Sequence, residues 1–353
     1  MKQTATKTTF RRNELSPAAA GYAFDEGRWT KDIAGIGSVV IAPLDWRHSQ
    51  AASYVGFGED RRPLDALAFL VELQRQTWGM ASEDLAPVNL LAVIADTGGA
   101  ILVAYDQRSG FNADGWLGFV FGLGSRDGVL VSHMLGVRPE ARGAAGIGWA
   151  LKLAQADAAR QTGHREMNWT FDPMRGGNAR LNLEKLGAVI EEMTIDKYGI
   201  LTTELYGAVP SDRFIARWDL ESSAAIRKVG VAATRSEPPA GLREALALPI
   251  LTSESMARLL ELEPPRIAYE IPGDIDELAR VDPRRAVAWR AQTRALLARF
   301  VTTNLAVPIA NNLDPTALDI HVTPGAYLID GFASGFDESG RRGFYLLTRK
   351  GSQ

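Results

Sequence analysis

The sequence of 353 residues predicts an α+β fold built on a mixed, mainly antiparallel sheet flanked by helices, and two observations carry that prediction. Short β-branched and aromatic runs follow one another before residue 140, separated by turns rich in Gly and Asp, which is typical of antiparallel hairpins. A loop rich in Gly and Ala then opens a long apolar helix. At this length we expect two domains, each with its own core.

The first predicted elements alternate between strand and helix. Residues 38–44 form a β-branched run that ends in a proline, which favours a strand. Residues 63–77 place apolar side chains at helical spacing after a proline, which favours a helix. Residues 90–95 and 100–105 are two apolar runs joined by Asp-Thr-Gly-Gly, so we expect them to form a hairpin.

The next elements complete the predicted first domain. Residues 116–123 and 129–137 repeat the hairpin pattern, and an Ala- and Leu-rich helix follows at 147–162. A strand at 166–171 and a helix at 179–185 come next, and a glycine follows each helix. Three antiparallel strands or more therefore precede the loop, and a helix, a strand and a helix follow it.

Changes in amino-acid composition along the chain predict its division into domains. We expect a mobile arm at residues 1–36, a first domain at 37–220, an Ala-, Arg- and Pro-rich linker at 221–248 and a smaller C-terminal α/β domain at 249–353. The elements expected in the last part are a strand at 266–271, a helix at 284–300 and a closing hairpin of 327–332 with 343–348.

Composition excludes several classes of function. A net charge of -3 gives no positive field for a nucleic acid, so that partner is not expected. The absence of cysteine excludes disulfides, thiolate metal sites and an acyl-cysteine intermediate, and the isolated histidines predict no metal site. No apolar stretch has the length of a membrane span or the pattern of a signal peptide, so we expect a cytoplasmic protein without a membrane partner.

The loop between residues 138 and 148 is the sharpest feature of the sequence. Its small residues allow successive backbone N–H groups to converge at a helix N-terminus, which favours a bound phosphate. Arg138 and Arg142 add cationic side chains nearby. The alternative is a tight connection without a ligand. The preceding antiparallel strands argue against a dinucleotide-binding βαβ unit.

These motifs resemble those of a known superfamily. The stretches LGVRPEARGAAGIGWALKLA, WTFDP and NARLNLEKLGA are similar to successive motifs of the GNAT N-acyltransferase superfamily. Together SHMLGV, MNWTFDP, NARLN, KLGA and GAVPSDRFIARW resemble a bacterial branch of predicted GNAT enzymes with a C-terminal extension. The resemblance covers about residues 41–220 and implies a GNAT-like fold that binds acetyl-CoA or another acyl-CoA as co-substrate. The C-terminal part is then expected to be a degenerate GNAT-like half.

The resemblance also implies which residues bind the acyl-CoA. It places Leu135, Gly136 and Val137 on the pantetheine arm. It places Arg142, Gly143, Ala144, Ala145, Gly146 and Gly148 around the pyrophosphate. Asn178 and Asn182 are further candidates for cofactor binding, although Asn178 is also suited to cap the following helix.

Two positions depart from the superfamily pattern. Three residues separate Arg142 from Gly146, one more than in the superfamily loop. The position of the tyrosine that protonates the departing thiolate holds Leu183, which has no proton to give.

Candidates for the acid and base follow from these departures. His133 is the candidate base, because its ordinary pKa suits the task and because a regular strand places it on the same face as Leu135 and Val137. Ser132 points to the opposite face unless a bulge intervenes. Tyr198 is the candidate acid, with Tyr206 as its alternative, and Asp172 is more typical of a turn.

The sequence therefore predicts an acyl-CoA-dependent N-acyltransferase. It would move an acetyl or larger acyl group, such as succinyl, directly to a small amine such as an amino acid. The alternatives are a CoA-binding sensor without catalysis and a structural scaffold. The C-terminal part would wall off the acceptor pocket or form a homodimer contact, and Arg290 and Arg294 share a helix face suited to an acceptor carboxylate or to solvent.

Overall fold

A computed structural model describes residues 14–44, 63–78, 84–97, 99–109, 115–125, 127–143, 146–203, 207–234, 241–308, 318–338 and 340–352. The chain divides into two compact units, Met1–Met167 and Asn168–Gln353.

The first unit is an antiparallel sheet with helices on both faces. Its described elements are η1 (Pro17–Ala20), β1 (Ala23–Asp25), β2 (Arg28–Ile33), β3 (Gly37–Pro43), α2 (Pro63–Trp78), α3 (Val88–Asp96), β4 (Ala100–Asp106), η3 (Gln107–Ser109), β5 (Trp116–Gly124), β6 (Val129–Val137), η4 (Pro139–Ala141) and α4 (Ile147–Gln161). The strands lie in the order β1 to β6, and each pairs antiparallel with the next. The prediction of an α+β fold with a mainly antiparallel sheet is confirmed.

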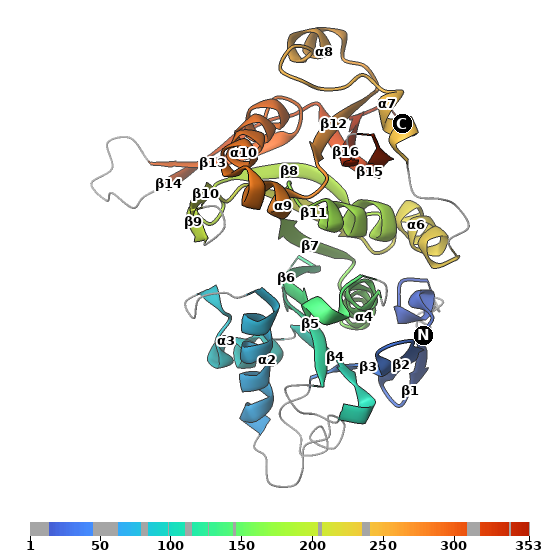
Figure 1. Cartoon of the computed structure of the whole chain (residues 1–353). Helices are drawn as coiled ribbons and strands as arrows, with labels where there is room; N and C mark the ends of the chain where they lie inside the picture. Colours follow the sequence, from blue (N-terminus) through green and yellow to red (C-terminus); the bar gives the residue numbers. More distant parts are fainter. Residues whose placement is uncertain are drawn as a thin grey trace, which may run out of the picture. The chain divides into compact units, whose positions relative to one another are not determined.

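Two hydrophobic cores lie on the two faces of this sheet. Helices α2 and α3 cover one face, where Phe119 and Phe121 of β5 are fully buried. Helix α4 covers the other face, where its Leu151 packs in one core with Val120. Figure 1 shows α2 and α3 on one side of β4, β5 and β6 and α4 on the other. This layering places the N-terminus of α4 just after the end of β6.

One predicted hairpin is wrong. Residues 90–95 form helix α3 rather than a strand, and Leu91 and Ile94 bury side chains at helical spacing. The tight connection to β4 is made by Gly99, whose amide donates to the carbonyl of Ile94 at 2.9 Å. A Cβ at Gly99 would lie 2.4 Å from the carbonyl oxygen of Gly122, so the glycine serves close packing rather than a hairpin turn.

The second unit is a mixed sheet with helices. Its described elements after β7 (Glu166–Phe171) are α5 (Gly176–Ala179), the π-helical turn η5 (Arg180–Leu186), β8 (Val189–Ile195), β9 (Ile200–Thr203), β10 (Gly207–Pro210), β11 (Arg213–Asp219), α6 (Ser223–Thr234), α7 (Leu242–Leu246), α8 (Met256–Leu262), β12 (Arg266–Pro272), α9 (Ile275–Val281), α10 (Pro283–Leu297), β13 (Thr302–Pro308), β14 (Leu318–Thr323), β15 (Tyr327–Asp337) and β16 (Gly340–Arg349). The main strand order is β7-β11-β8-β15-β16-β12, and β13 pairs with β8 and β14. The predicted strand, helix and hairpin near the C-terminus are confirmed.

The division of the chain differs from the predicted boundaries. Strand β13 pairs in parallel with β8, and Ile329 of β15 pairs with Ile190 of β8. Tyr345 of β16 also donates from its buried hydroxyl to the carbonyl of Pro173 at 2.7 Å. Residues 168–220 therefore share their sheet and core with the C-terminal part.

Two predicted flexible segments contain regular structure. The expected linker at residues 221–248 includes α6 and α7, and Lys228 of α6 donates to the carbonyls of Leu183 and Asp330 at 3.1 and 2.6 Å. Within the expected arm at residues 1–36, the structure describes 14–36, which include η1, β1 and β2. Buried Tyr22 and Trp29 attach this segment to the core on the α4 face. Their aromatic area explains why the segment is ordered.

Candidate functional site

A β-bulge interrupts β6 at His133. Phe121 of β5 pairs with Met134 and Gly122 pairs with Ser132, so His133 is the extra residue. The bulge reverses the alternation of side chains, which puts Leu135 and Val137 in the core beneath α4. The His133 ring instead lies 5.7 Å from the ring of Phe121, which belongs to the other core. The expectation that His133 shares a face with Leu135 and Val137 is therefore wrong.

His133 remains accessible at this bulge. The residue is exposed, yet partial burial of the imidazole lowers its pKa below the ordinary 6.5, because the charged form loses hydration. A neutral imidazole at neutral pH has a nitrogen lone pair that accepts a proton. The position is compatible with a general base.

The bulge also directs Ser132 into a buried polar network that the sequence did not reveal. Lys152 of α4 donates to the Ser132 hydroxyl at 2.7 Å, and that hydroxyl lies 2.7 Å from Oε1 of Gln155. All three residues are at most 4% exposed, and burial lowers the pKa of Lys152 well below 10.5. The only signal in the sequence was a Lys and a Gln three residues apart within an otherwise apolar helix face. The network fixes α4 to the bulged part of β6.

The glycine loop contains two left-handed glycines and leads into the N-terminus of α4. Gly143 and Gly146 adopt φ of +84° and +64°, a region that favours glycine. Gly146 is also the N-cap of α4 and has no side chain to accept hydrogen bonds from the first-turn amides. No acidic residue occupies the first turn of this 15-residue helix. The N-terminus of α4 therefore presents backbone donors and a partial positive charge, which favour an anion. Ala144 and Ala145 lie outside the described residues.

Arg142 binds two backbone carbonyls, and its predicted contact with a pyrophosphate stays a prediction. Its Nε donates to the carbonyl of Val137 at 2.9 Å, and its Nη2 donates to the carbonyl of Thr77 at 2.7 Å. The guanidinium thus ties the loop to the end of β6 and to α2. Gly136 lies in β6 where a Cβ would approach Phe119 and Thr77 within 3 Å, and Gly148 lies in the first turn of α4. The predicted contacts of Leu135, Gly136, Val137 and Gly148 with an acyl-CoA stay predictions.

The two asparagine candidates lie in different surroundings. Asn182 is 3% exposed, and its Oδ1 accepts a hydrogen bond from the Trp169 indole at 3.2 Å, so it is part of the core. Asn178 is exposed and lines a surface pocket of about 230 Å³ together with Arg175, Asp276 and Arg341. Leu183, which the resemblance places at the position of the acid, is fully buried.

Tyr198 lies at an exposed turn of the second unit. Its side chain is half exposed, and its hydroxyl is 3.0 Å from the Thr170 hydroxyl on β7. The turn is closed by a hydrogen bond of 2.9 Å from the Gly199 amide to the Asp196 carbonyl. A phenol held beside β7 can supply the proton that Leu183 cannot. Tyr206, the alternative acid, lies outside the described residues.

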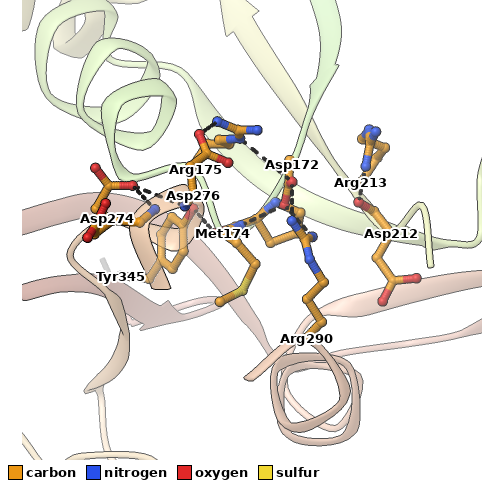
Figure 2. Close-up of polar contacts among 11 residues, drawn as sticks. Asp172, Met174, Arg175, Asp212, Arg213, Asp274, Asp276, Arg290 and Tyr345 are labelled. Carbon is orange, nitrogen blue, oxygen red and sulfur yellow. Dashed lines mark hydrogen bonds and ion pairs between the residues drawn. The ribbon is translucent and has the colours of Figure 1, made fainter. Parts of the chain in front are cut away.

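Arg290 and Arg294 bind carboxylates of this chain rather than an acceptor. Arg290 forms a two-point ion pair with Asp172, with nitrogen–oxygen distances of 3.0 and 2.9 Å. Figure 2 shows this pair of Arg290 and Asp172. Arg294 donates to Asp212 at 2.8 Å and to Asp196 at 2.7 Å. Arg290 thus joins α10 to the segment after β7, whereas Arg294 joins α10 to the residue after β8 and the residue before β11. The expectation that they hold an acceptor carboxylate is therefore wrong.

Asp172 is ionised in this arrangement. Burial by itself would raise its pKa, but the hydrogen bonds and the charge of Arg290 outweigh burial and hold the pKa below 3.8. The Met174 amide also donates to Asp172 at 2.9 Å, so both the turn and the helix fix this carboxylate.

Glu184 of the π-helical turn is the second strongly perturbed carboxyl group. Burial raises its pKa from 4.5 to about 7, although Arg180, Lys228 and Lys185 act in the opposite direction. Its Oε2 is 3.5 Å from Arg180, and its buried Oε1 has no hydrogen-bond partner among the described residues. The ionised form is thus poorly solvated in the folded state.

Replacing Glu184 by Gln should change how stability depends on pH. The folded pKa lies above the unfolded value, so the wild type loses stability as pH rises from about 4.5 through 7. We expect Glu184→Gln to be more stable than the wild type by about 3 kcal/mol at pH 8.5, with the difference shrinking towards pH 4.5. Urea unfolding at both pH values measures this. Glu191→Gln, at an exposed ion pair, is the control. A stability difference between Glu184→Gln and the wild type that stays constant from pH 4.5 to 8.5 would contradict the raised pKa of Glu184.

Neither a candidate metal site nor a candidate membrane-spanning helix is found among the described residues. Among the described residues, no group of three or more His, Cys, Asp or Glu side chains is arranged to hold a metal ion. None of the helices described is both long enough and apolar enough to span a membrane.

Comparison with known proteins gives structural matches alone. No protein-family model and no curated protein sequence matches this chain. Solved structures do match, including a phosphinothricin acetyltransferase from Sinorhizobium meliloti in complex with acetyl-CoA, with 19% identity, coverage of 46% of this chain and 87% of that chain, and a TM-score of 0.36. An IAA acetyltransferase from Bacillus cereus has 14% identity, coverage of 51% and 99%, and a TM-score of 0.34. The ribosomal-protein-S18-alanine N-acetyltransferase from Escherichia coli has 11% identity, coverage of 52% and 96%, and a TM-score of 0.37.

All three of these proteins are acetyltransferases. The Sinorhizobium enzyme is a member of the GNAT superfamily, the superfamily that the sequence motifs resemble. At such identities and TM-scores, the similarity concerns the course of the backbone over about half of this chain and identifies no substrate.

Proposed function

We propose that this chain is a GNAT-type N-acyltransferase that uses acetyl-CoA or another acyl-CoA as the acyl donor. The observation that carries the proposal is the pair of left-handed glycines, Gly143 and Gly146, at the uncapped N-terminus of α4, directly after a bulged strand. Such a terminus binds a pyrophosphate by backbone donors and helix charge. The motifs that resemble the GNAT superfamily occupy the same segments.

The chemistry assigned to the chain's own residues is direct acyl transfer. His133 takes a proton from the acceptor amine, whose nitrogen then attacks the thioester carbon. The carbon–sulfur bond breaks, and Tyr198 gives its proton to the departing thiolate. The acceptor is a small amine such as an amino acid, and the acyl group is acetyl or larger. Location in the cytoplasm and formation of a homodimer stay predictions.

A thiol-release assay tests this function directly. Acetyl-CoA and succinyl-CoA are each incubated with the protein and a panel of amino acids, amino-acid amides and simple amines, and free CoA is measured. We expect amine-dependent CoA release with at least one donor. CoA binding without release on any amine would favour the CoA-binding sensor, which the buried Leu183 and the longer loop motivate.

His133→Ala tests the assignment of the base. We expect the wild-type rate to fall with acid along a limb below pH 6.5, because the pKa of His133 is lowered by burial. The variant should lose that limb and about a hundredfold in kcat at pH 7. His164→Ala is the control, since His164 binds Thr162 and Ala159 within its own turn. A variant with the full rate and the same pH limb would exclude His133 as the base.

A further inference from the structure

Two cationic side chains meet at the Tyr198 ring in the second unit. The Arg213 guanidinium lies 5.5 Å from the ring centre, and the Lys197 ammonium lies 5.9 Å from it. The hydroxyl of this ring lies 3.0 Å from the Thr170 hydroxyl. Lys197 and Tyr198 are exposed and Arg213 and Thr170 are partly exposed, so a ligand can reach the group. Cations and hydroxyls gathered in this way are suited to an anion.

The carboxylates nearby are already engaged by other arginines. Arg290 holds both oxygens of Asp172, and Arg294 holds Asp196 and both oxygens of Asp212. Lys197 and Arg213, by contrast, form no ion pair within the part of the chain that the structure describes. Arg213 donates only to the backbone carbonyl of Asp212, at 2.9 Å, and Figure 2 shows its guanidinium directed away from the Asp212 carboxylate.

The turn that presents these groups is fixed in place. Asp196, the first residue of the turn, has φ of +46°, which is strained for a residue other than glycine. Its amide donates to Asp212 at 3.0 Å, its carboxylate is held by Arg294, and the Tyr198 amide donates to the Ser211 hydroxyl at 2.8 Å. The strain is therefore maintained by α10. Strain retained in this way is characteristic of binding sites.

We propose that Arg213, Lys197 and the Thr170 hydroxyl form a subsite for a substrate carboxylate. This inference rests on the proposed acyl transfer and specifies its substrate class. The carboxylate has two sources, an amino-acid acceptor or a dicarboxylic acyl group such as succinyl, and both have the same chemistry. Arg213 supplies the planar fork that a carboxylate accepts at two points.

Kinetics with matched substrates separates the two sources. One arm uses acetyl-CoA with amino acids and their amides, and the other uses succinyl-CoA and acetyl-CoA with an amide acceptor. We expect the wild type to prefer the carboxylated substrate in one arm by at least tenfold in kcat/KM. Arg213→Gln should raise KM for that substrate at least tenfold and leave KM for its uncharged counterpart unchanged. Arg217→Gln, an exposed position on the same strand, is the control.

A binding measurement keeps the subsite and the proposed function separately testable. N-acetyl amino acids and their methyl esters, together with succinate and its dimethyl ester, are titrated into the wild type and Arg213→Gln without CoA. We expect the wild type to bind a free acid at least tenfold more tightly than the corresponding ester. Arg213→Gln should bind the acid and the ester with equal affinity. Such binding without CoA turnover would refute the acyl transfer alone. Equal binding of acids and esters, or no loss in Arg213→Gln when its melting curve is unchanged, would overturn the subsite.

Discussion

Replacing Arg290 by Met is expected to lower the free energy of unfolding by about 3–5 kcal/mol at neutral pH. The substitution leaves the largely buried Asp172 carboxylate without its two-point partner. The side chains of Arg290 and Asp172 are only 9% and 17% exposed, so water compensates poorly for the lost ion pair. Urea unfolding of the wild type and the variant measures the effect.

Comparisons within α10 and along the pH scale test the reason for this loss. Arg284→Met, at an exposed position of the same helix, should change stability by less than about 0.5 kcal/mol. Asp172→Asn combined with Arg290→Met should recover part of the loss, because the carboxylate that lost its two-point partner is then neutral. The folded pKa of Asp172 is depressed, so the stability that the pair contributes is present above about pH 4 and is lost as pH falls below it. A loss of under about 1 kcal/mol at neutral pH would show that solvent replaces the ion pair.

Replacing Gly146 by Glu is expected to weaken CoA binding at least a hundredfold. Gly146 has φ of +64° and caps α4, and the new carboxylate would oppose a pyrophosphate by charge and by volume. Loss of two charge-assisted hydrogen bonds corresponds to at least about 3 kcal/mol, or a hundredfold. Calorimetric titration of each protein with CoA measures the change.

Gly163→Glu is the matched control for this substitution. Gly163 follows the other end of α4, has φ of +87°, and, like Gly146, has no atom within 4 Å of an added Cβ. Its replacement therefore introduces similar backbone strain and the same charge far from the loop. We expect Gly163→Glu to bind CoA like the wild type. If Gly146→Glu bound CoA as tightly as the wild type, the proposal that the N-terminus of α4 binds the pyrophosphate would be wrong.

Local patterns in the sequence predicted most strands and helices but misassigned one short run. The helix at Ile147–Gln161 and the strand at Glu166–Phe171 have clear periodicity and glycine boundaries, and both are confirmed. Val88–Asp96 forms a helix because six apolar residues fit either a strand or one helical face, and only packing of Leu91 and Ile94 decides between them.

Local sequence patterns could not predict the contacts between residues far apart in the chain. The bulge at His133 arises from pairing with β5, and it changed which side chains share its face. Arg290 and Arg294 were recognised as a cationic helix face, but their partners lie 82 to 118 residues away in the chain. The same contacts explain why residues 168–220 fold with the C-terminal part. Ion pairs that join distant segments leave no local signature.

Comparison of CoA with pantetheine by calorimetric titration tests the central claim most directly, because pantetheine lacks the pyrophosphate that the loop at Gly143 and Gly146 is proposed to hold. We expect the wild type to bind CoA at least a hundredfold more tightly than pantetheine. Equal affinity for the two compounds, or no binding of CoA, would contradict the account.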